Sequence, residues 1–437
     1  MKTFRYLLLL ALLILSPCIS MAQSNGVASD GAVIEQSPYV FPTYDQLPDW
    51  TKLIYTKESY ETFRSSSTLE LVRIKYTSDG LKVVGFIYKP KMTEGKKLPL
   101  IIFNRGGVGE EAKIGNSNFH NIYEMYRYAS EGFVVIASQY RGIDGGEGKD
   151  EMGGSDLNDV MNLVPLAKSL GYVDTNRMFI WGASRGAQMA LQAVKQGLPV
   201  KAAVVVGAPT DWNIALSQSP SLIRFVKDMW PDFESRKEEH IKSRSAALWA
   251  DQINVPLLIL QGGADARFAT PQILAFAQKL DALGKIYELV VYAKDDHPVS
   301  LNREDRLRKT IDWFKNPRTI PVSRVIGRTI ADQGVGAAAK HYRELKESQP
   351  DKYDFSEGEL NNLGYELLGA GRVKEAVEIF KLNVVAYPAS PNVYDSLGEA
   401  YGVAGERELA VKNYKKSLEL NPQSTSAVEA LRRLDQK

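Results

Sequence analysis

The chain has 437 residues, of which 44% are hydrophobic and 24% are charged. This composition is that of a globular protein and excludes disordered, collagen-like and coiled-coil classes. Its 54 Lys and Arg residues nearly balance its 52 Asp and Glu residues, so the net charge is only +2. Because affinity for nucleic acid depends on neutralising phosphates, no nucleic-acid partner is expected. The length predicts two or three domains.

The first 22 residues are typical of a secretory signal peptide. A cationic start is followed by an apolar run over 7–15 and by small residues that end at Ala22. The run is well short of the roughly 20 apolar residues that span a bilayer. We therefore expect an exported protein, periplasmic or secreted, with no membrane span. Lipid attachment at Cys18 is disfavoured, because Pro17 stands where such signals need a small residue.

Cys18 is the only cysteine in the chain. Cleavage after Ala22 therefore leaves a mature protein without disulfides, a Cys₄ zinc site or a thiol nucleophile.

The polar, proline-containing residues 23–65 are interpreted as an N-terminal leader that packs late. A strand–turn–strand hairpin is expected over 69–88. Short apolar runs then alternate with helical periodicity, which predicts a mostly parallel, doubly wound α/β sheet covered on both faces. The runs are 100–103, 133–136, 178–181, 202–206, 257–260 and 289–292. We place this domain at 66–317, with an insertion at 208–254.

The most informative motif directly follows the run at 178–181. Residues 182–186 have the sequence Gly-Ala-Ser-Arg-Gly, and a helical pattern begins after them. This G-x-S-x-G pattern between a strand and a helix is typical of a nucleophile elbow, which exposes a serine hydroxyl at the positive end of a helix. On its own the motif equally fits a glycine-rich turn in which Ser184 only caps the helix.

Two residues farther along supply the groups that a serine nucleophile needs. Asp265 follows the run at 257–260, and His297 follows the run at 289–292. A serine hydroxyl attacks only when a base takes its proton, and a carboxylate must orient that base. The chain order Ser184, Asp265, His297, each in a loop after a predicted strand, is that of the α/β-hydrolase fold.

Other candidates for the base and the acid fit less well. The three other histidines lie in polar helical segments or in the C-terminal region. Asp295 and Asp296 stand beside His297, but neighbouring residues rarely direct a side chain into each other's ring. We therefore expect Asp265 to orient His297.

An oxyanion hole is expected next to Ser184. The backbone N–H of Arg185 supplies one donor. The second comes from the loop after the run at 100–103, where Gly106 and Gly107 can present N–H groups.

Residues 69–316 resemble the catalytic domain of the prolyl oligopeptidase (S9) family of serine peptidases. The matching segments are the turn at 78–80, Arg-Gly-Gly at 105–107, Tyr-Arg-Gly at 140–142, Val-Asp-Thr-Asn-Arg at 173–177, the 182–186 elbow, Asp265 with Arg267, and His297. The resemblance implies hydrolysis of peptides through an acyl-serine intermediate.

The chain departs from the family at several points. The residues before the hairpin are too few for the family's substrate-screening β-propeller. Arg105 stands where many members have Tyr or His, and its side chain is expected to donate to the oxyanion or to face an acidic group on the substrate. Arg185 and Ala187 stand where the family often has Tyr and Gly, which leaves peptide specificity open.

The 208–254 insertion carries several aromatic residues and is expected to cover the acyl pocket. Each ring also fits simple packing of a helical excursion, and we expect Trp212 and Trp230 to contact the substrate.

No cofactor and no metal is expected. The glycine-rich segments at 107–112 and 145–149 lack the companion residues that dinucleotide and phosphate sites need. The sequence also has no HExxH motif.

Residues 322–437 contain an internal repeat of 34 residues. The recurring pairs are Leu363-Gly364 and Leu397-Gly398, Ala376 and Ala410, Phe380 and Tyr414, and Pro388 and Pro422. This period resembles tetratricopeptide (TPR) repeats, with the best copies at about 357–390 and 391–424 and a poorer copy before them. We expect an all-α helical repeat domain that packs on the hydrolase, self-associates or binds a protein partner.

These patterns together predict an exported serine hydrolase, with a peptidase acting on short or unfolded peptides as the preferred function. A carboxylesterase acting on small esters with the same triad is the alternative among enzymes. A TPR peptide-binding protein with a vestigial hydrolase domain is the alternative from another class, and the intact triad argues against it.

Overall fold

The computed structural model describes residues 29–91, 95–115, 119–350 and 352–435. The predicted signal peptide at 1–22, with Cys18, lies outside these residues.

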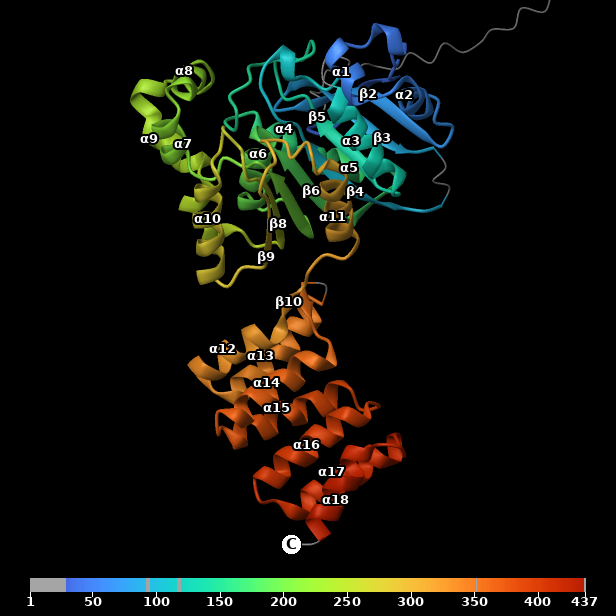
Figure 1. Ribbon diagram of the computed structural model, residues 1–437, viewed down its shortest axis with the longest axis vertical. Helices are drawn as coiled ribbons and strands as arrows, with labels where there is room; N and C mark the ends of the chain where they lie inside the picture. Colours follow the sequence, from blue (N-terminus) through green and yellow to red (C-terminus); the bar gives the residue numbers. More distant parts are fainter. Residues whose placement is uncertain (1–28, 92–94, 116–118, 351, 436–437) are drawn as a thin grey trace, which may run out of the picture.

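A nine-stranded sheet forms the centre of the first part of the chain (Figure 1). Its strand order is β1-β2-β3-β5-β4-β6-β7-β8-β9. The strands from β5 to β9 pair in parallel, whereas β1, β2 and β3 pair antiparallel, as does β3 with β5. The strands are β1 (Val33–Pro38), β2 (Leu69–Ser78), β3 (Leu81–Pro90), β4 (Leu98–Asn104), β5 (Val134–Ser138), β6 (Val173–Ala183), β7 (Ala202–Val206), β8 (Leu257–Gly262) and β9 (Tyr287–Tyr292). The predicted hairpin and the mostly parallel sheet are confirmed.

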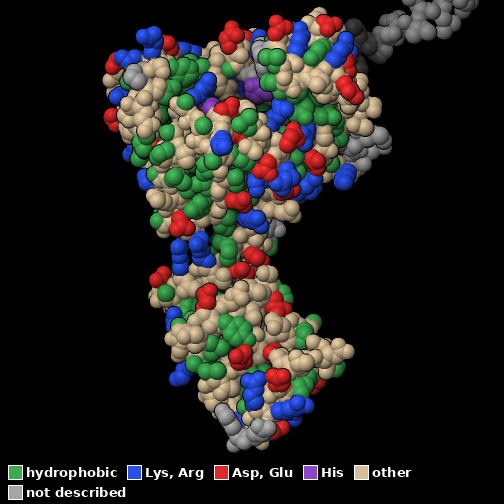
Figure 2. Space-filling view, in the orientation of Figure 1, with side chains coloured by type: hydrophobic (Ala, Val, Ile, Leu, Met, Phe, Trp, Pro, Cys, Tyr) green, Lys and Arg blue, Asp and Glu red, His purple; other side chains and the backbone are tan. Residues whose placement is uncertain are grey.

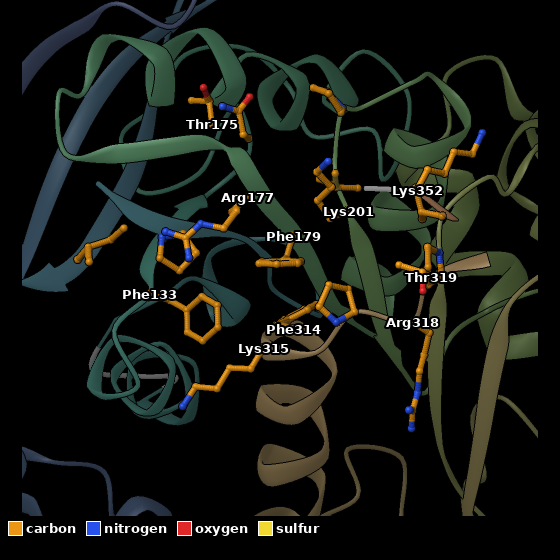
Figure 3. Close-up of a pocket in the computed structure, with 18 of the residues that line it drawn as sticks. Phe133, Thr175, Arg177, Phe179, Lys201, Phe314, Lys315, Arg318, Thr319 and Lys352 are labelled. Carbon is orange, nitrogen blue, oxygen red and sulfur yellow. The ribbon is translucent and has the colours of Figure 1, made fainter. Parts of the chain in front are cut away.

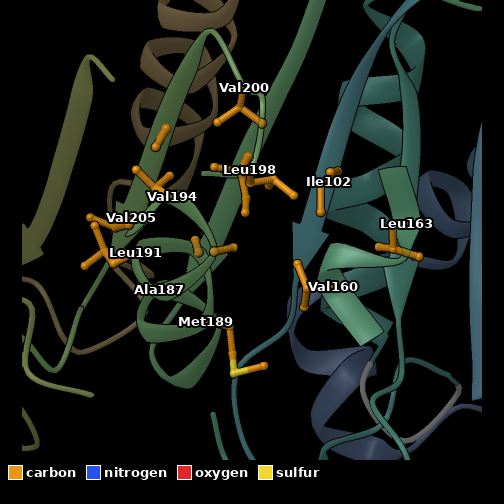
Figure 4. Packing of buried hydrophobic residues seen from close by; sticks show 14 of the residues in the cluster. Ile102, Val160, Leu163, Ala187, Met189, Leu191, Val194, Leu198, Val200 and Val205 are labelled. Atoms are coloured by element: carbon orange, nitrogen blue, oxygen red, sulfur yellow. The ribbon is translucent and has the colours of Figure 1, made fainter. Parts of the chain in front are cut away.

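Two separate hydrophobic cores lie on the two faces of this sheet. Successive side chains of a strand point to opposite faces, and in β4 Leu100 and Ile102 enter one core while Ile101 and Phe103 enter the other. Figure 4 shows the first core, where α6 packs side chains such as Met189 on the sheet. The helices of this part are α1 (Asp49–Ile54), α2 (Lys57–Arg64), α3 (Phe119–Ser130), α4 (Leu157–Met161), α5 (Leu163–Ser169), α6 (Arg185–Lys195), α10 (Thr270–Ala282) and α11 (Arg303–Lys315).

The described residues of the predicted 23–65 leader pack on the hydrolase part of the chain. Strand β1 pairs antiparallel with β2 at the edge of the sheet. In α2, the side chains of Tyr60 and Phe63 are 1% and 3% exposed and belong to the second core. This segment is polar because most side chains of an edge strand face solvent, so β1 has no apolar periodicity.

The 208–254 insertion folds into a small helical cap that stands beside the sheet (Figure 1). Its helices are α7 (Trp212–Gln218), α8 (Pro220–Met229) and α9 (Phe233–Arg244). They enclose a hydrophobic cluster of their own, to which Met152 and Phe268 contribute from the main domain.

The C-terminal part is an array of helices with its own hydrophobic core, and a narrower waist joins it to the hydrolase part (Figures 1 and 2). The helices are α12 (Val322–Gln333), α13 (Val335–Ser348), α14 (Glu357–Gly369), α15 (Val373–Ala386), α16 (Pro391–Val403), α17 (Arg407–Leu420) and α18 (Thr425–Asp435). The pairs α14–α15 and α16–α17 match the two best predicted repeats in place. Their assignment to the TPR family stays a prediction.

The sequence did not predict the short parallel pair of β10 (Ile320–Pro321) and β11 (Tyr353–Asp354), which lies at this waist.

Acidic and basic side chains are interspersed over the face of the molecule seen in Figure 2. In the described part of the chain, no helix is both long enough and apolar enough to cross a lipid bilayer.

Candidate active site

Ser184 occupies a strained turn between β6 and α6. Its backbone has φ 54° and ψ −123°, a region that residues with a Cβ atom rarely adopt. The Ser184 N–H donates to the carbonyl of Val206 at 2.7 Å, and its own carbonyl accepts from the N–H of Ala187 at 2.9 Å. The sheet and the helix thus hold the serine in a conformation that it would not choose alone, as a nucleophile elbow requires.

The two glycines of the motif are required by close backbone contacts. A Cβ atom on Gly182 would lie 2.0 Å from the carbonyl oxygen of Gly186. One on Gly186 would lie 1.9 Å from the carbonyl oxygen of Asn104. Only glycine lets β6, α6 and the end of β4 approach this closely.

The predicted acid and base are in direct contact. Nδ1 of His297 lies 2.7 Å from Oδ2 of Asp265. The other carboxylate oxygen, Oδ1, accepts from the N–H groups of Arg267 at 2.8 Å and Phe268 at 3.0 Å. Burial opposes ionisation of Asp265, but the hydrogen bond from His297 and these two N–H groups outweigh it and lower its pKa. Asp265 is therefore a carboxylate that can fix the tautomer of the imidazole.

The imidazole lies beside the serine turn. A Cβ atom on Gly207 would come within 2.9 Å of Nδ1 and 3.0 Å of Cε1 of His297. Gly207 follows Val206, whose carbonyl binds the Ser184 N–H. The other ring nitrogen, Nε2, is buried and has no hydrogen-bond partner among the described residues. Hydrogen bonds between a nucleophile and its base are often long before substrate binds.

Asp295 supports the loop of His297 and does not orient its ring. Its Oδ1 accepts from the N–H of Leu301 at 2.9 Å, and its Oδ2 accepts from both the N–H and the side chain of Asn302 at 2.9 Å. These contacts fold the 295–302 segment back on itself and present His297 toward the sheet.

The glycine loop after β4 lies against the nucleophile. A Cβ atom on Gly106 would be 3.3 Å from Cβ of Ser184. Gly107 has φ +68°, which favours glycine. The loop is therefore close enough to contribute a donor to an oxyanion on Ser184.

The side chain of Arg105 does not have the predicted role. Its guanidinium is 0% exposed and donates to the backbone carbonyls of Gly106, Gly107 and Gln139. A group enclosed in this way can neither face a substrate nor donate to its oxyanion, so the prediction for this side chain is wrong. One of these hydrogen bonds reaches Gln139, 34 positions away along the chain, which the sequence pattern did not indicate.

The side chain of Arg185 is also buried, and carboxylates surround its guanidinium group. It donates to both carboxylate oxygens of Asp150 at 2.6 Å and to Asp156 at 2.7 Å. The predicted oxyanion donor is its backbone N–H at the start of α6, which this geometry leaves in place.

Trp212 and Trp230 do not line an open substrate site. Their side chains are 2% and 1% exposed and pack against each other in the cap. The prediction that they contact the substrate is wrong for this structure, because the cap uses its large rings for its own core.

Phe268 connects the cap with the active site, and the sequence analysis missed it. Its ring centroid lies 5.9 Å from that of Trp212 and 5.5 Å from that of His297. The sequence signal that could have indicated this contact is the aromatic residue three positions after Asp265.

A cavity of about 940 Å³ lies at the other end of the sheet, beside the waist (Figure 3). Phe133, Phe179 and Phe314 are among the residues that line it, together with several lysines and arginines. Its strand residues come from the amino ends of the parallel strands, whereas Ser184, Asp265 and His297 follow the carboxyl ends. The cavity is therefore separate from the candidate active site.

Within the residues that the structure describes, no group of three or more His, Cys, Asp or Glu side chains is arranged to hold a metal ion.

Residues 118–318 match the model of the prolyl oligopeptidase family. The uncharacterized peptidase YtmA of Bacillus subtilis is 28% identical over 57% of this chain and 95% of its own length. The uncharacterized peptidase YuxL of the same organism is 29% identical over 54% of this chain but only 37% of its own length. The uncomplexed acylaminoacyl peptidase of Pyrococcus horikoshii is 25% identical, with a TM-score of 0.51, over 59% of this chain and 43% of that one.

The family model spans β5–β9 and the positions of Ser184, Asp265 and His297. Residues 118–318 therefore resemble the prolyl oligopeptidase (S9) family domain, and the chain is an S9-like serine hydrolase.

Proposed function

We propose that the protein is an exported serine peptidase that cleaves short or unfolded peptides through an acyl-serine intermediate. The observation that carries this proposal is the 2.7 Å contact of His297 with Asp265 beside the strained turn of Ser184. Relatives described as peptidases support peptide bonds as the substrate.

In the first half of the reaction, Nε2 of His297 takes the proton of Ser184 as Oγ attacks the scissile carbonyl carbon. Asp265 holds the Nδ1–H and stabilises the imidazolium that forms. The N–H of Arg185 and the 106–107 loop bind the oxyanion, and the C–N bond breaks as His297 gives its proton to the leaving amine. In the second half, His297 activates a water molecule that hydrolyses the acyl-serine.

The choice of short or unfolded peptides follows from what surrounds the site. In the described part of the chain, the segment before β2 forms an edge strand and two short helices, and the cap of α7–α9 stands beside the sheet. Phe268 joins this cap to His297. We propose that the cap selects which substrates can reach Ser184.

Export is proposed from the pattern at 1–22 alone. For the C-terminal helices we propose packing on the hydrolase, self-association or contact with a protein partner, because they have a hydrophobic core of their own.

Labelling with a fluorophosphonate tests the proposed chemistry, since this probe needs an activated serine and an oxyanion hole but no particular substrate. We expect wild type to be labelled and Ser184→Ala to be unlabelled. Ser217→Ala is a suitable control, because this serine lies exposed in the cap and binds only the carbonyl of Ile214. Folded wild type that resists the probe would contradict the proposal.

A substrate comparison then separates the two enzyme candidates. Cleavage of unstructured peptides by wild type, lost in Ser184→Ala, supports the peptidase. Turnover of p-nitrophenyl esters with no peptide cleavage would replace it with the carboxylesterase.

A further inference from the structure

Three side chains hold the carbonyl groups of the loop beside Ser184. The hydroxyl of Tyr140 donates to the carbonyl of Arg105 at 3.2 Å. The Arg105 guanidinium donates to the carbonyl of Gly106 at 3.2 Å. The carbonyl of Gly107 accepts from Arg105 and from Arg185, each at 3.3 Å. Successive peptide groups of the loop are thus fixed from one side.

Fixing a carbonyl also fixes the N–H on the other side of the same peptide group. In a trans peptide the two groups point in opposite directions, and the described residues contain no cis peptide bond. Tyr140 therefore sets the direction of the Gly106 N–H, and Arg105 sets that of the Gly107 N–H. Neither N–H has an acceptor in the described part of the chain, and Gly106 lies directly against Ser184.

The two arginines of this device differ in their charge partners. Arg185 is paired with Asp150 and Asp156. Arg105 has no carboxylate at ion-pair distance among the described residues, and its hydrogen bonds go to carbonyl oxygens alone.

Burying a cation without a counter-charge is costly. Burial, and then the nearby charge of Arg185, lower the pKa of Arg105 to about 10, so it stays protonated at neutral pH.

The positive charge also strengthens the donors that face the site. A hydrogen bond from an ionised donor is about twice as strong as one between neutral groups. It polarises the peptide group that accepts it, which makes the opposite N–H a better donor. The ring of Tyr140 contacts both guanidinium groups: its centroid lies 5.0 Å from Cζ of Arg105 and 4.1 Å from Cζ of Arg185.

We propose that Arg105 is a positioning residue for the oxyanion hole. It acts through the carbonyl group of Gly106, whose peptide carries the Gly107 N–H, and Tyr140 assists it through the carbonyl group of Arg105. Arg105 does not touch the substrate; it holds and polarises a peptide group whose N–H stabilises the oxyanion on Ser184. This inference rests on the proposed function and adds a positioning residue to the candidate triad.

The variant Arg105→Lys tests this role. Lysine keeps the charge but lacks the fork that reaches several carbonyls at once. Because the oxyanion exists only in the transition state and the intermediate, the loss belongs to kcat. We expect kcat for a p-nitrophenyl ester to fall about tenfold to a hundredfold. The upper end of this range equals the smallest fall in kcat expected when a direct oxyanion donor is removed. KM and the pH dependence should stay as in wild type, since His297 and Asp265 are undisturbed.

Arg244→Lys is a matched control. Arg244 is also buried, at 2% exposed, and also donates to backbone carbonyls, those of Met152 and Glu151. It lies in the cap and makes no contact with the 105–107 loop. We expect its kcat to stay within about threefold of wild type, as for a substitution outside the reacting groups.

Tyr140→Phe gives a second test that does not depend on whether Arg105→Lys folds. It keeps the ring that contacts the two guanidinium groups and removes only the hydroxyl that donates to the Arg105 carbonyl. We expect a smaller fall in kcat, about threefold to tenfold, again with KM unchanged.

An unchanged kcat in both Arg105→Lys and Tyr140→Phe would overturn the inference while wild type remains an active hydrolase. An equal loss in Arg244→Lys, or a loss confined to KM, would also overturn it, because either result means a general effect of burial or of substrate binding. Failure of wild type itself to react with fluorophosphonate would instead contradict the proposed function.

Discussion

Nδ1 of His297 lies 2.7 Å from Oδ2 of Asp265, although 32 positions separate the two residues in the chain. Two neighbouring parallel strands produce this contact, since Asp265 follows β8, His297 follows β9, and β8 pairs with β9 over its whole length. The carboxyl ends of such strands meet at one edge of the sheet, where open α/β folds place their ligands. The contact between Asp265 and His297 is therefore a product of strand order.

Asp265→Asn tests whether the carboxylate of Asp265 orients the imidazole of His297. The amide has almost the same shape but presents an N–H₂ group to the imidazole and favours the wrong tautomer. We expect kcat to fall about 10³- to 10⁴-fold with little change in KM, measured with a p-nitrophenyl ester. Asp296→Asn is the matched control, because this exposed carboxylate binds only Ser300. A kcat for Asp265→Asn close to that of wild type would remove Asp265 from the triad.

Asp295→Asn tests the support of the histidine loop through stability. Burial opposes ionisation of Asp295, but hydrogen bonds from Asn302, Leu301 and Asp296 outweigh it and lower its pKa. A carboxyl with a lowered pKa in the folded state stabilises the fold above its ordinary pKa of about 4, and this contribution is lost as the pH falls below that value. We expect the variant to lose about 2 kcal/mol of unfolding free energy at pH 7.

The difference between wild type and Asp295→Asn should shrink as the pH falls below about 4 and through the lowered pKa of Asp295, because the carboxylate of wild type is then progressively protonated. Thermal unfolding at several pH values measures this, with Asp281→Asn on the exposed side of α10 as control. A difference that is constant from pH 7 to pH 3 would show that ionisation of Asp295 contributes nothing.

The sequence predicted the sheet and the order of the candidate triad because both are encoded locally. The buried parallel strands appear as unbroken apolar runs. Ser184 lies in a short motif whose glycines are imposed by contacts within a few residues and with Asn104.

Side-chain orientation was not predictable in the same way for Arg105, Trp212 and Trp230. Arg105 turns toward Gln139 because β4 and β5 are neighbours in the sheet. The two tryptophans face each other because three cap helices fold together. These are tertiary contacts, and a residue type alone does not specify on which side of a loop its side chain lies.

Gly186→Ala tests the packing that holds the elbow. A Cβ atom at this position would come within 1.9 Å of a backbone oxygen, and neither α6 nor the end of β4 can move without disturbing the sheet. We expect a loss of at least about 2 kcal/mol of unfolding free energy, or failure to fold. Gly171→Ala is the control, since a Cβ atom there would meet nothing within 4 Å beyond its own chain neighbours. Equal denaturation midpoints for the two variants would contradict the required close approach at the elbow.

Truncation after Pro317 tests what the C-terminal helices contribute. The two cores of the sheet contain no residue beyond Phe314 in α11, and the core of the C-terminal array begins at Val322, so the two parts share no hydrophobic cluster. The truncated protein should therefore fold and keep its turnover of a p-nitrophenyl ester. If the helical array brings substrates to the hydrolase, cleavage of long unstructured peptides should fall, seen as a rise in KM that short peptides do not show. Equal KM values for long peptides in both forms would assign the array to assembly, whereas loss of ester turnover would show that the hydrolase depends on it for folding.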